Sequence, residues 1–397
     1  MGTLPTVDGC APIHLFASTK SWIEGNALHQ LEQVAALPGV EAVAAMPDLH
    51  PGKYGPVGCA ILADRLYPQF VGSDIGCGMG LFRLDVPGRK LRLDKLADRI
   101  RSLGTPWDGD FQTAIADAGL SPTAYDVSLG SIGGGNHFCE FQMIDQIIAP
   151  DAAAIAGLDP ASAYLLVHSG SRGFGHAILE RHLASGGATL DLESQATACY
   201  LAEHDRAVRW ARLNRQIIAE RAAGAARADF ALIADLSHNL MELQSSAPSL
   251  AKVLHRKGAA SSDRGLVPVP GSRGTLSYLV EPLAATRPET LASLAHGAGR
   301  KYDRASMHGR IRAKKSDVAK LQRNPFGGLI VCEDRDLLVE EAPDAYKSID
   351  RVIADLVEFD LARVVATFRP LLTFKTAARS IRNDAKRLAK PHREDRR

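Results

Sequence analysis

The sequence lacks long apolar runs, paired cysteines and a leader-like start. No run approaches the roughly 18 apolar residues that a transmembrane helix needs. The six cysteines lie scattered among 397 residues without a CxxC pair, which argues against a disulfide framework and a structural zinc knuckle. The first residues form neither a basic region nor an apolar core of a signal peptide. We therefore expect no contact with a membrane and a place in the reducing cytoplasm, where a cysteine stays a thiol.

The sequence also lacks a strong excess of charge. The formal net charge is +2, so a nucleic-acid surface must be a local patch. Hydrophobic residues make up 46% and charged residues 23%, as in ordinary globular proteins. We expect one large domain over residues 1–378, followed by a basic tail, 379–397, with eight Lys/Arg and three Asp/Glu. Such a tail is more commonly a solvated end than an RNA contact. We take a monomer as the default.

Apolar runs repeatedly end on glycine-rich loops that carry a polar residue. Helical spacing predicts helices over 25–37 and 194–226, the second with a broad apolar face. Short apolar runs predict strands at 40–45, 57–62, 80–84, 164–167, 229–236 and 274–280, while 348–368 mixes both spacings. This alternation predicts an α+β fold of mixed β-sheets with surrounding helices. Loops from the whole chain would build a central metal site.

The segment from Ser73 to Gly78 places a carboxylate, Asp74, and a thiol, Cys77, three residues apart among glycines. Glycines allow a tight turn, so both side chains can face one point. A thiolate can bridge two cations and a carboxylate adds a hard ligand. For an isolated DxxC, however, a buried cysteine beside a turn aspartate is the more common explanation.

Three histidines, His137, His168 and His238, lie in short motifs bounded by Gly, Ser or Asn rather than by core residues. With the thiolate and carboxylate they suit Mn²⁺, Zn²⁺, Co²⁺ or Fe²⁺ and not Ca²⁺. Lone histidines are more often satisfied polar residues than ligands, and His50 and His176 stay open on this evidence. Neighbouring Asn136, Asn239 and Glu140 can support ligands or contact substrate.

His296 lies in a turn of small residues that leaves room for a bulky partner. An imidazole can attack a phosphoryl group to give a phosphoramidate, or it can bind a metal, and spacing alone does not separate the two. Four cations are candidate contacts for phosphate, although a surface cation is the usual explanation for any one of them: Lys53, Arg172, Arg300 and Arg304.

Taken together, these motifs resemble the RtcB-type RNA ligases, in family order over nearly the whole chain. The matching segments are MPDLHPG (46–52), GSDIGCGMG (72–80), GGGNHFCE (133–140), HSGSRGFG (168–175), HN (238–239), HRKGA (255–259), PGSRGTLSYLV (270–280), HGAGR (296–300) and EAPDAYKSID (341–350). Each alone means little, but their joint occurrence is highly specific.

The resemblance implies a GTP- and Mn²⁺-dependent enzyme that joins an RNA 3′-phosphate or 2′,3′-cyclic phosphate end to a 5′-hydroxyl end. Cys77 would bridge two Mn²⁺ ions, with Asp74 and His137 on one and His168 and His238 on the other. His296 would carry GMP, and Asp48 would orient its imidazole. The implied nucleotide contacts are Asn136, Glu140, Asn239, Ser272, Ser277, Gly297, Ala298, Gly299, Tyr346 and Lys375. The implied RNA or phosphate contacts are Arg172, Arg304, Lys53 and Arg300.

The chain departs from the family pattern in a few positions. Arg273 stands where a hydrophobic residue is usual, Asp303 replaces the serine before Arg304, and Lys53 lies in the loop after Pro51. These features resemble a bacterial subgroup encoded beside release factor H and linked to repair of damaged ribosomal RNA. They leave the implied ligands intact and bear on substrate choice and on rate. An archease-like activator is a further partner that the resemblance suggests, and the sequence does not say whether it is needed.

Two other classes of function remain open at this point. A metal-dependent phosphohydrolase would use the same ligands without guanylylation. A weakly active RNA- or ribosome-associated factor is compatible with the departures at Arg273 and Asp303. A covalent GMP label indicates a ligase, phosphate release without a label indicates a hydrolase, and RNA binding with neither indicates a binding factor.

Overall fold

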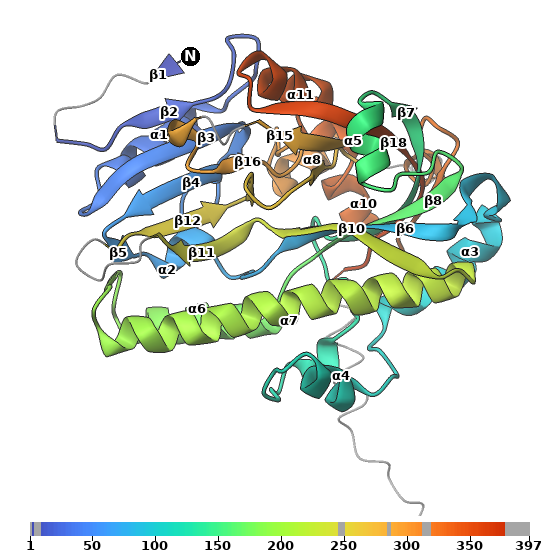
Figure 1. The fold of residues 1–397 in the computed structure, drawn as a ribbon, viewed down its shortest axis with the longest axis horizontal. Coiled ribbons are helices and arrows are strands. Elements are labelled where there is room, and N and C mark those ends of the chain that lie inside the picture. Colours follow the sequence, from blue (N-terminus) through green and yellow to red (C-terminus); the bar gives the residue numbers. More distant parts are fainter. Residues whose placement is uncertain (1, 4–8, 245–250, 284–286, 312–318, 378–397) are drawn as a thin grey trace, which may run out of the picture.

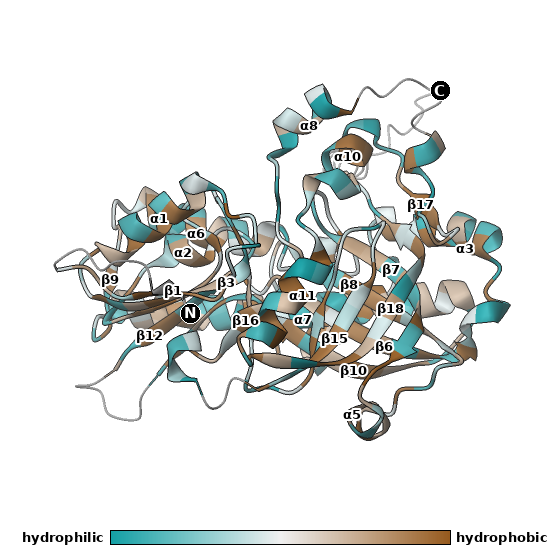
Figure 2. Cartoon of the chain, turned by 90° about the horizontal axis from the view of Figure 1, so that it is seen from above, coloured by the Kyte–Doolittle hydropathy of each residue, from teal (hydrophilic) through white to brown (hydrophobic). Residues whose placement is uncertain are grey.

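Two β-sheets lie side by side and are covered by helices (Figures 1 and 2). The computed structural model describes residues 2–3, 9–244, 251–283, 287–311 and 319–377. A six-stranded sheet has the order β1-β2-β3-β4-β12-β11, and an eight-stranded sheet has the order β10-β6-β8-β7-β18-β15-β14 with β17 beside β18. The β2–β3 and β17–β18 pairs are parallel and the other pairs in these sheets antiparallel. The mixed sheets confirm the α+β prediction.

The strands of the six-stranded sheet are β1 (Gly2–Thr3), β2 (Ile13–Leu15), β3 (Val40–His50), β4 (Val57–Ala63), β11 (Asn239–Leu243) and β12 (Val253–Lys257). Those of the eight-stranded sheet are β6 (Gly78–Pro87), β7 (Phe138–Ile147), β8 (Ser162–Ser169), β10 (Phe230–Ser237), β14 (Val267–Val269), β15 (Ser277–Pro282), β17 (Leu329–Val331) and β18 (Ala362–Phe374). Two further pairs join β5 (Arg65–Leu66) to β9 (Leu190–Asp191) and β13 (Ala259–Ser261) to β16 (Ser293–Ala295).

The α-helices within the described ranges are α1 (Gly25–Ala35), α2 (Pro68–Val71), α3 (Leu93–Ile100), α4 (Phe111–Asp117), α5 (Pro150–Ile155), α6 (Gly173–Ala184), α7 (Gln195–Ala226), α8 (Arg304–Arg310), α10 (Arg335–Glu340) and α11 (Ile349–Glu358). Within those same ranges, no helix combines the length and apolar character required to cross a membrane.

The longest helix, α7, runs along the eight-stranded sheet (Figure 1). Ser194 caps its first turn by accepting a hydrogen bond from the backbone of Thr197. Its apolar face packs Ile218 and Ala222 against Phe82 and Leu165 of the sheet. In a separate cluster, α1 packs Leu31 and Val34 against Val43 and Ile61 of the six-stranded sheet. Within the described residues the chain passes from one of these two sheets to the other three times, between β4 and β6, between β10 and β11 and between β12 and β14.

Most predicted elements are confirmed, with shifted ends. The helices over 25–37 and 194–226 are α1 and α7, and the mixed segment 348–368 resolves into α11 followed by β18. The strand predicted at 274–280 was placed too early. Backbone and hydroxyl bonds between Ser272 and Thr275 form a turn, so β15 begins only at Ser277. The predicted domain boundary at 378 and the tail 379–397 lie outside the described residues.

Candidate metal and nucleotide site

The pairing of four strands brings the predicted metal ligands to one edge of the eight-stranded sheet. In the β6–β8 pair, Gly78 lies opposite Ser169 and Met79 opposite His168. In the β7–β8 pair, Phe138 lies opposite His168, and β10 ends with Ser237 opposite Gly78. Cys77, His137 and His238 each come directly before or after one of these paired residues. The strand register therefore places these three residues next to His168 at the same edge of the sheet.

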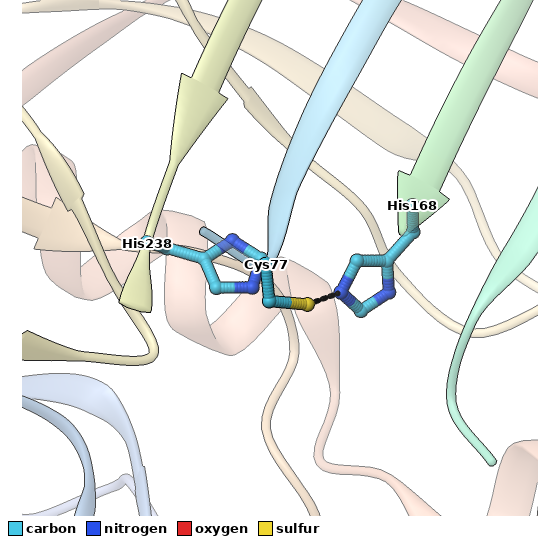
Figure 3. Close-up of side chains that lie close together, drawn as sticks. All are labelled: Cys77, His168 and His238. Carbon is cyan, nitrogen blue, oxygen red and sulfur yellow. Dashed lines mark hydrogen bonds between the residues drawn. The ribbon is translucent and has the colours of Figure 1, made fainter. Parts of the chain in front are cut away.

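The side chains at this edge form two triads that share one sulfur. Cys77, His168 and His238 are one group and Asp74, Cys77 and His137 the other, with the donor atoms of each group within 4.8 Å of one another. The Cys77 Sγ lies 3.2 Å from His168 Nε2 and 3.3 Å from His137 Nε2. Figure 3 shows the sulfur between the two rings of the first triad.

The donor set fits metal ions. A sulfur and a nitrogen bound to one ion at about 2.3 and 2.1 Å lie roughly 3.1–3.6 Å apart, which matches the sulfur–nitrogen distances here. The Oδ1 atom of Asp74 is buried without a hydrogen-bond partner in the described structure. His137 Nε2 lies 2.8 Å from Asp74 Oδ2 and 3.3 Å from the Cys77 Sγ, so this nitrogen faces both other members of its triad.

The pKa shifts of these groups determine which of them must lose a proton when a cation binds. Burial, reinforced by nearby imidazoles, lowers the pKa of His168 and His238 well below the usual value. Burial and the Asp74 charge raise the pKa of Cys77, so a bound cation would displace a thiol proton. Burial opposes ionisation of Asp74, but the charge and hydrogen bond of His137 outweigh it and lower its pKa.

His296 lies beside this cluster and is held by a buried carboxylate. Its ring centroid is 4.6 Å from that of His238, and its Nδ1 lies 2.6 Å from Asp48 Oδ2. The same oxygen accepts a hydrogen bond from the His296 backbone N–H at 3.1 Å. Asp48 itself lies in an irregular part of β3, where pairing with β4 is interrupted between Ala45 and His50. The carboxylate contacts Nδ1, so Nε2 is the ring nitrogen that is available for other contacts.

A glycine is required where the turn after His296 packs against β3. Gly299 has φ +71°, and a Cβ there would lie 2.1 Å from the Asp48 carbonyl oxygen. The small residues after His296 thus allow the backbone of that turn to pack directly on β3.

A cavity of about 480 Å³ opens over the cluster. The predicted residues that line it are Lys53, Asp74, Cys77, Asn136, Glu140, His168, His238, Asn239, Ser272, His296, Gly297, Ala298, Gly299, Arg300, Arg304, Tyr346 and Lys375. Asp48, His137, Arg172 and Ser277 do not line it but lie behind it. Asp48 contacts His296, and Arg172 Nη1 lies 3.0 Å from His137 Nδ1. The hydroxyl of Ser277 accepts a hydrogen bond from Gln142 at 3.0 Å.

One wall of the cavity is a buried carboxylate surrounded by cations. Glu341 lies 3.0 Å from Arg300, 3.2 Å from Arg304 and 3.5 Å from Lys375. Tyr346 also donates its hydroxyl to this carboxylate. Burial opposes its ionisation, but the charges of Lys375, Arg300 and Arg304 outweigh it and lower the Glu341 pKa to about 2. Glu340 also lies 4.0 Å from Arg304, so the three cations face two carboxylates and the wall keeps a net positive charge for phosphate groups.

The Glu341 cluster predicts a loss of stability in acid. A carboxylate with a folded pKa of about 2 and an ordinary value of 4.5 stabilises the fold above pH 4.5 and loses this contribution as the pH falls. We expect the unfolding free energy of wild type to exceed that of Glu341→Gln at pH 7, and this difference to shrink by about 2 kcal/mol by pH 3. Urea unfolding at both pH values measures it. A pH-independent difference would contradict the prediction.

A second buried carboxylate, Glu140, also lines the cavity. Gln142 Nε2 donates to Glu140 Oε1 at 2.7 Å, and the Thr373 hydroxyl donates to Oε2. Burial raises the Glu140 pKa to about 7 despite these bonds and the charge of Lys375. The carboxyl group is therefore ready to pair with an N–H donor of a ligand, which would favour the ionised form.

The loop with Arg172 is strained in the backbone. Arg172 has φ 58°, a region that residues with a side chain rarely adopt. A Cβ on Gly133 would overlap the Arg172 guanidinium, so the glycine leaves the space that this side chain occupies. In this position the guanidinium Nη1 lies 3.0 Å from His137 Nδ1.

The structure explains two departures from the family pattern. Arg273 is buried and donates to the carbonyls of Leu338 and Glu341 at 2.7 and 3.0 Å, which satisfies the end of α10. Asp303 is the N-cap of α8 and accepts from the Ser306 N–H at 2.9 Å. Both residues brace helices that border the cavity, and neither disturbs the ligand triads.

Several residues of the site were not predicted from the sequence. Lys257 lines the cavity and donates to the Val71 carbonyl at 2.9 Å. Arg215 of α7 is fully buried and donates to the Gly76 and Ser169 carbonyls, fixing the loop with Cys77. Its signal was a polar pair, Asn214-Arg215, within an apolar helix face. His50, left open before, lines the cavity.

The geometry defines a centre suited to phosphoryl transfer, with two ligand triads, an oriented imidazole and a cationic wall. The family model described as "tRNA-splicing ligase RtcB" matches residues 30–113 and 120–376. The chain belongs to the RtcB family, whose members are RNA ligases, and metal and GTP use are implied by this family.

Curated relatives match most of the chain. It is 44% identical to RNA-splicing ligase RtcB2 of Escherichia coli over 92% of this chain and 96% of the relative. It is 31% identical to RNA-splicing ligase RtcB of Mycobacterium bovis over 86% of this chain and 99% of the relative. It is 28% identical to tRNA-splicing ligase RtcB of Archaeoglobus fulgidus over 91% of this chain and 93% of the relative.

Proposed function

We propose that this RNA ligase joins an RNA 3′-phosphate or 2′,3′-cyclic phosphate end to a 5′-hydroxyl end, using GTP and two Mn²⁺ ions. The observation that carries the proposal is His296, fixed at 2.6 Å from the buried Asp48 and next to His238 of the ligand cluster. A nucleophilic imidazole and a metal centre thus share one cavity. Hydrolysis alone would not require the first of these.

The triads would hold the two ions, with Cys77 common to both. When bound, Mn²⁺ supplies positive charge that reduces repulsion between the phosphates and the incoming nucleophile. The imidazole of His296 attacks the α-phosphorus of GTP through Nε2, forming a P–N bond as the bond to pyrophosphate breaks. Asp48 stabilises the positive ring that results, because it already contacts Nδ1.

The RNA then reacts in two further steps. An oxygen of the RNA 3′-phosphate attacks the guanylyl phosphorus, the P–N bond to His296 breaks, and a phosphoanhydride then joins the RNA end to GMP. The 5′-hydroxyl of the second strand attacks the RNA-derived phosphorus, loses its proton and forms the phosphodiester, while GMP leaves with the oxygen that bridged the two phosphorus atoms. A 2′,3′-cyclic phosphate must first be opened by water to expose the 3′-phosphate.

The remaining cavity residues are assigned by their chemistry. The proposed nucleotide contacts are Asn136, Glu140, Asn239, Ser272, Gly297, Ala298, Gly299, Tyr346 and Lys375, with Ser277 acting through Gln142. A guanine edge presents N–H donors that the Glu140 carboxylate can accept. The proposed RNA or phosphate contacts are Lys53, Arg172, Arg300 and Arg304, since guanidinium groups bind phosphate in a bidentate manner.

The proposed cellular setting rests on the departures from the family pattern. The departures at Arg273 and Asp303 favour RNA repair, with ribosomal RNA and a release factor H context as the proposed setting and an archease-like activator as a proposed partner. We propose a monomer in the cytoplasm, where a reducing medium keeps the Cys77 thiol available.

Incubation with α-labelled GTP and Mn²⁺ tests the function. A label that stays with the protein on a denaturing gel and moves to a 3′-phosphate RNA supports the ligase. Release of phosphate from RNA without a protein label would favour the phosphohydrolase, and RNA binding with neither reaction would favour the binding factor.

A further inference from the structure

An exposed aromatic and basic surface borders the cavity on the side of α8. Trp22, in the loop before α1, leaves 42% of its surface exposed. Its ring lies 6.4 Å from that of Tyr302, tilted by 55°. The Arg310 guanidinium lies 3.6 Å from the centroid of the Tyr302 ring, and the Lys301 ammonium 5.2 Å from it. We call these four residues the Trp22 patch.

The patch is continuous with the cavity wall. Arg300, which lines the cavity, donates to the backbone carbonyl of Tyr302 at 3.0 Å. Arg304, two residues further on, also lines the cavity and leaves 46% of its side chain exposed. One short segment therefore carries cations from the inside of the cavity to the outer surface.

The charges of the patch are available for a ligand. Arg304 and His308 face Glu340, whereas within the described residues the side chains of Lys301 and Arg310 contact the Tyr302 ring. Asp303, the nearest acid in the chain, is occupied as the cap of α8. Exposed aromatics beside unpaired cations are the usual platform for unstacked bases and the phosphates between them.

We propose that the Trp22 patch binds a single strand of RNA as it leaves the cavity, with a base stacked on the Trp22 indole and phosphates on Lys301 and Arg310. This inference rests on the proposed function, because it takes RNA as the substrate in the cavity. It adds a binding surface outside the reacting centre, used only by strands long enough to reach it.

Binding of a labelled 3′-phosphate RNA of about ten nucleotides, measured by fluorescence anisotropy at fixed salt, tests the patch. We expect Trp22→Ala to raise the Kd about tenfold, since stacking of one base contributes on that order. Trp22→Phe keeps a ring and should stay within about threefold of wild type. The double variant Lys301→Glu/Arg310→Glu should weaken binding and flatten its salt dependence.

Controls separate the patch from charge in general and from the reaction. Arg89→Glu/Lys90→Glu alters two exposed cations next to β6, and it should leave the Kd unchanged. GMP labelling, which needs no RNA, should be equal in wild type and Trp22→Ala. The inference would be overturned if Trp22→Ala left the Kd unchanged. It would also be overturned if the Arg89/Lys90 variant raised the Kd as much as the Lys301/Arg310 variant does. Failure of wild type to take the label would instead reject the proposed function, while the Kd comparison still decides the patch.

Discussion

Alanine in place of His296 is expected to lower GMP labelling by more than about a thousandfold, because it removes the nitrogen that we propose forms the covalent bond. The loss should leave binding of GTP and of metal largely intact, since the ligand triads do not include His296. Labelling with α-labelled GTP on a denaturing gel, together with metal analysis of the same sample, measures both.

The neighbouring carboxylate supplies a graded comparison. Asp48→Asn keeps the size of the side chain but removes the negative charge at Nδ1, so labelling should fall by about a hundredfold or more without vanishing. His255→Ala alters a buried histidine of β12 that accepts a hydrogen bond from the backbone N–H of Tyr67. This variant should still take the GMP label. A labelled His296→Ala protein would show that another group is the nucleophile.

Removal of the Cys77 sulfur is expected to empty both metal positions together. The two triads share this atom alone, so Cys77→Ala leaves each with two donors. His238→Ala removes a donor from one triad and should reduce the metal content by about half. Metal analysis after dialysis, and the thiolate-to-cobalt absorption of a Co²⁺-loaded sample, report on the two variants.

Cys59→Ala is the matched control, because Cys59 is equally buried but bonds to the Pro56 carbonyl and belongs to neither triad. It should keep the wild-type metal content and cobalt spectrum. Retention of one full equivalent of metal by Cys77→Ala would contradict a shared sulfur.

The sequence indicated which side chains form the candidate site better than how they pack. The candidate residues between Asp74 and His296 could be selected because their motifs combine reactive side chains with glycines, which local sequence displays directly. The placement of Glu341 among Arg300, Arg304 and Lys375 depends on contacts between segments far apart in the chain. Local spacing holds no information on such contacts.

In the fold, too, features set by local sequence were predicted well and features set by long-range pairing were not. Helix α7 was predicted within a residue of its true start because its apolar face repeats over many turns. The strand β3 was predicted to end at Ala45 but runs to His50, since its last residues pair irregularly with β4. That irregular stretch carries Asp48, so the least predictable part of the strand supplies a central residue of the proposed site.

The register of β6, β7, β8 and β10 has a consequence for how this chain can vary. Alternate residues of a strand face opposite sides of a sheet, so the insertion of one residue within β8 would turn His168 away from Cys77. A length change in the loops between these strands would leave their pairing intact. We expect homologues to differ in length mainly in such connections and hardly at all within these four strands, however much their side chains diverge.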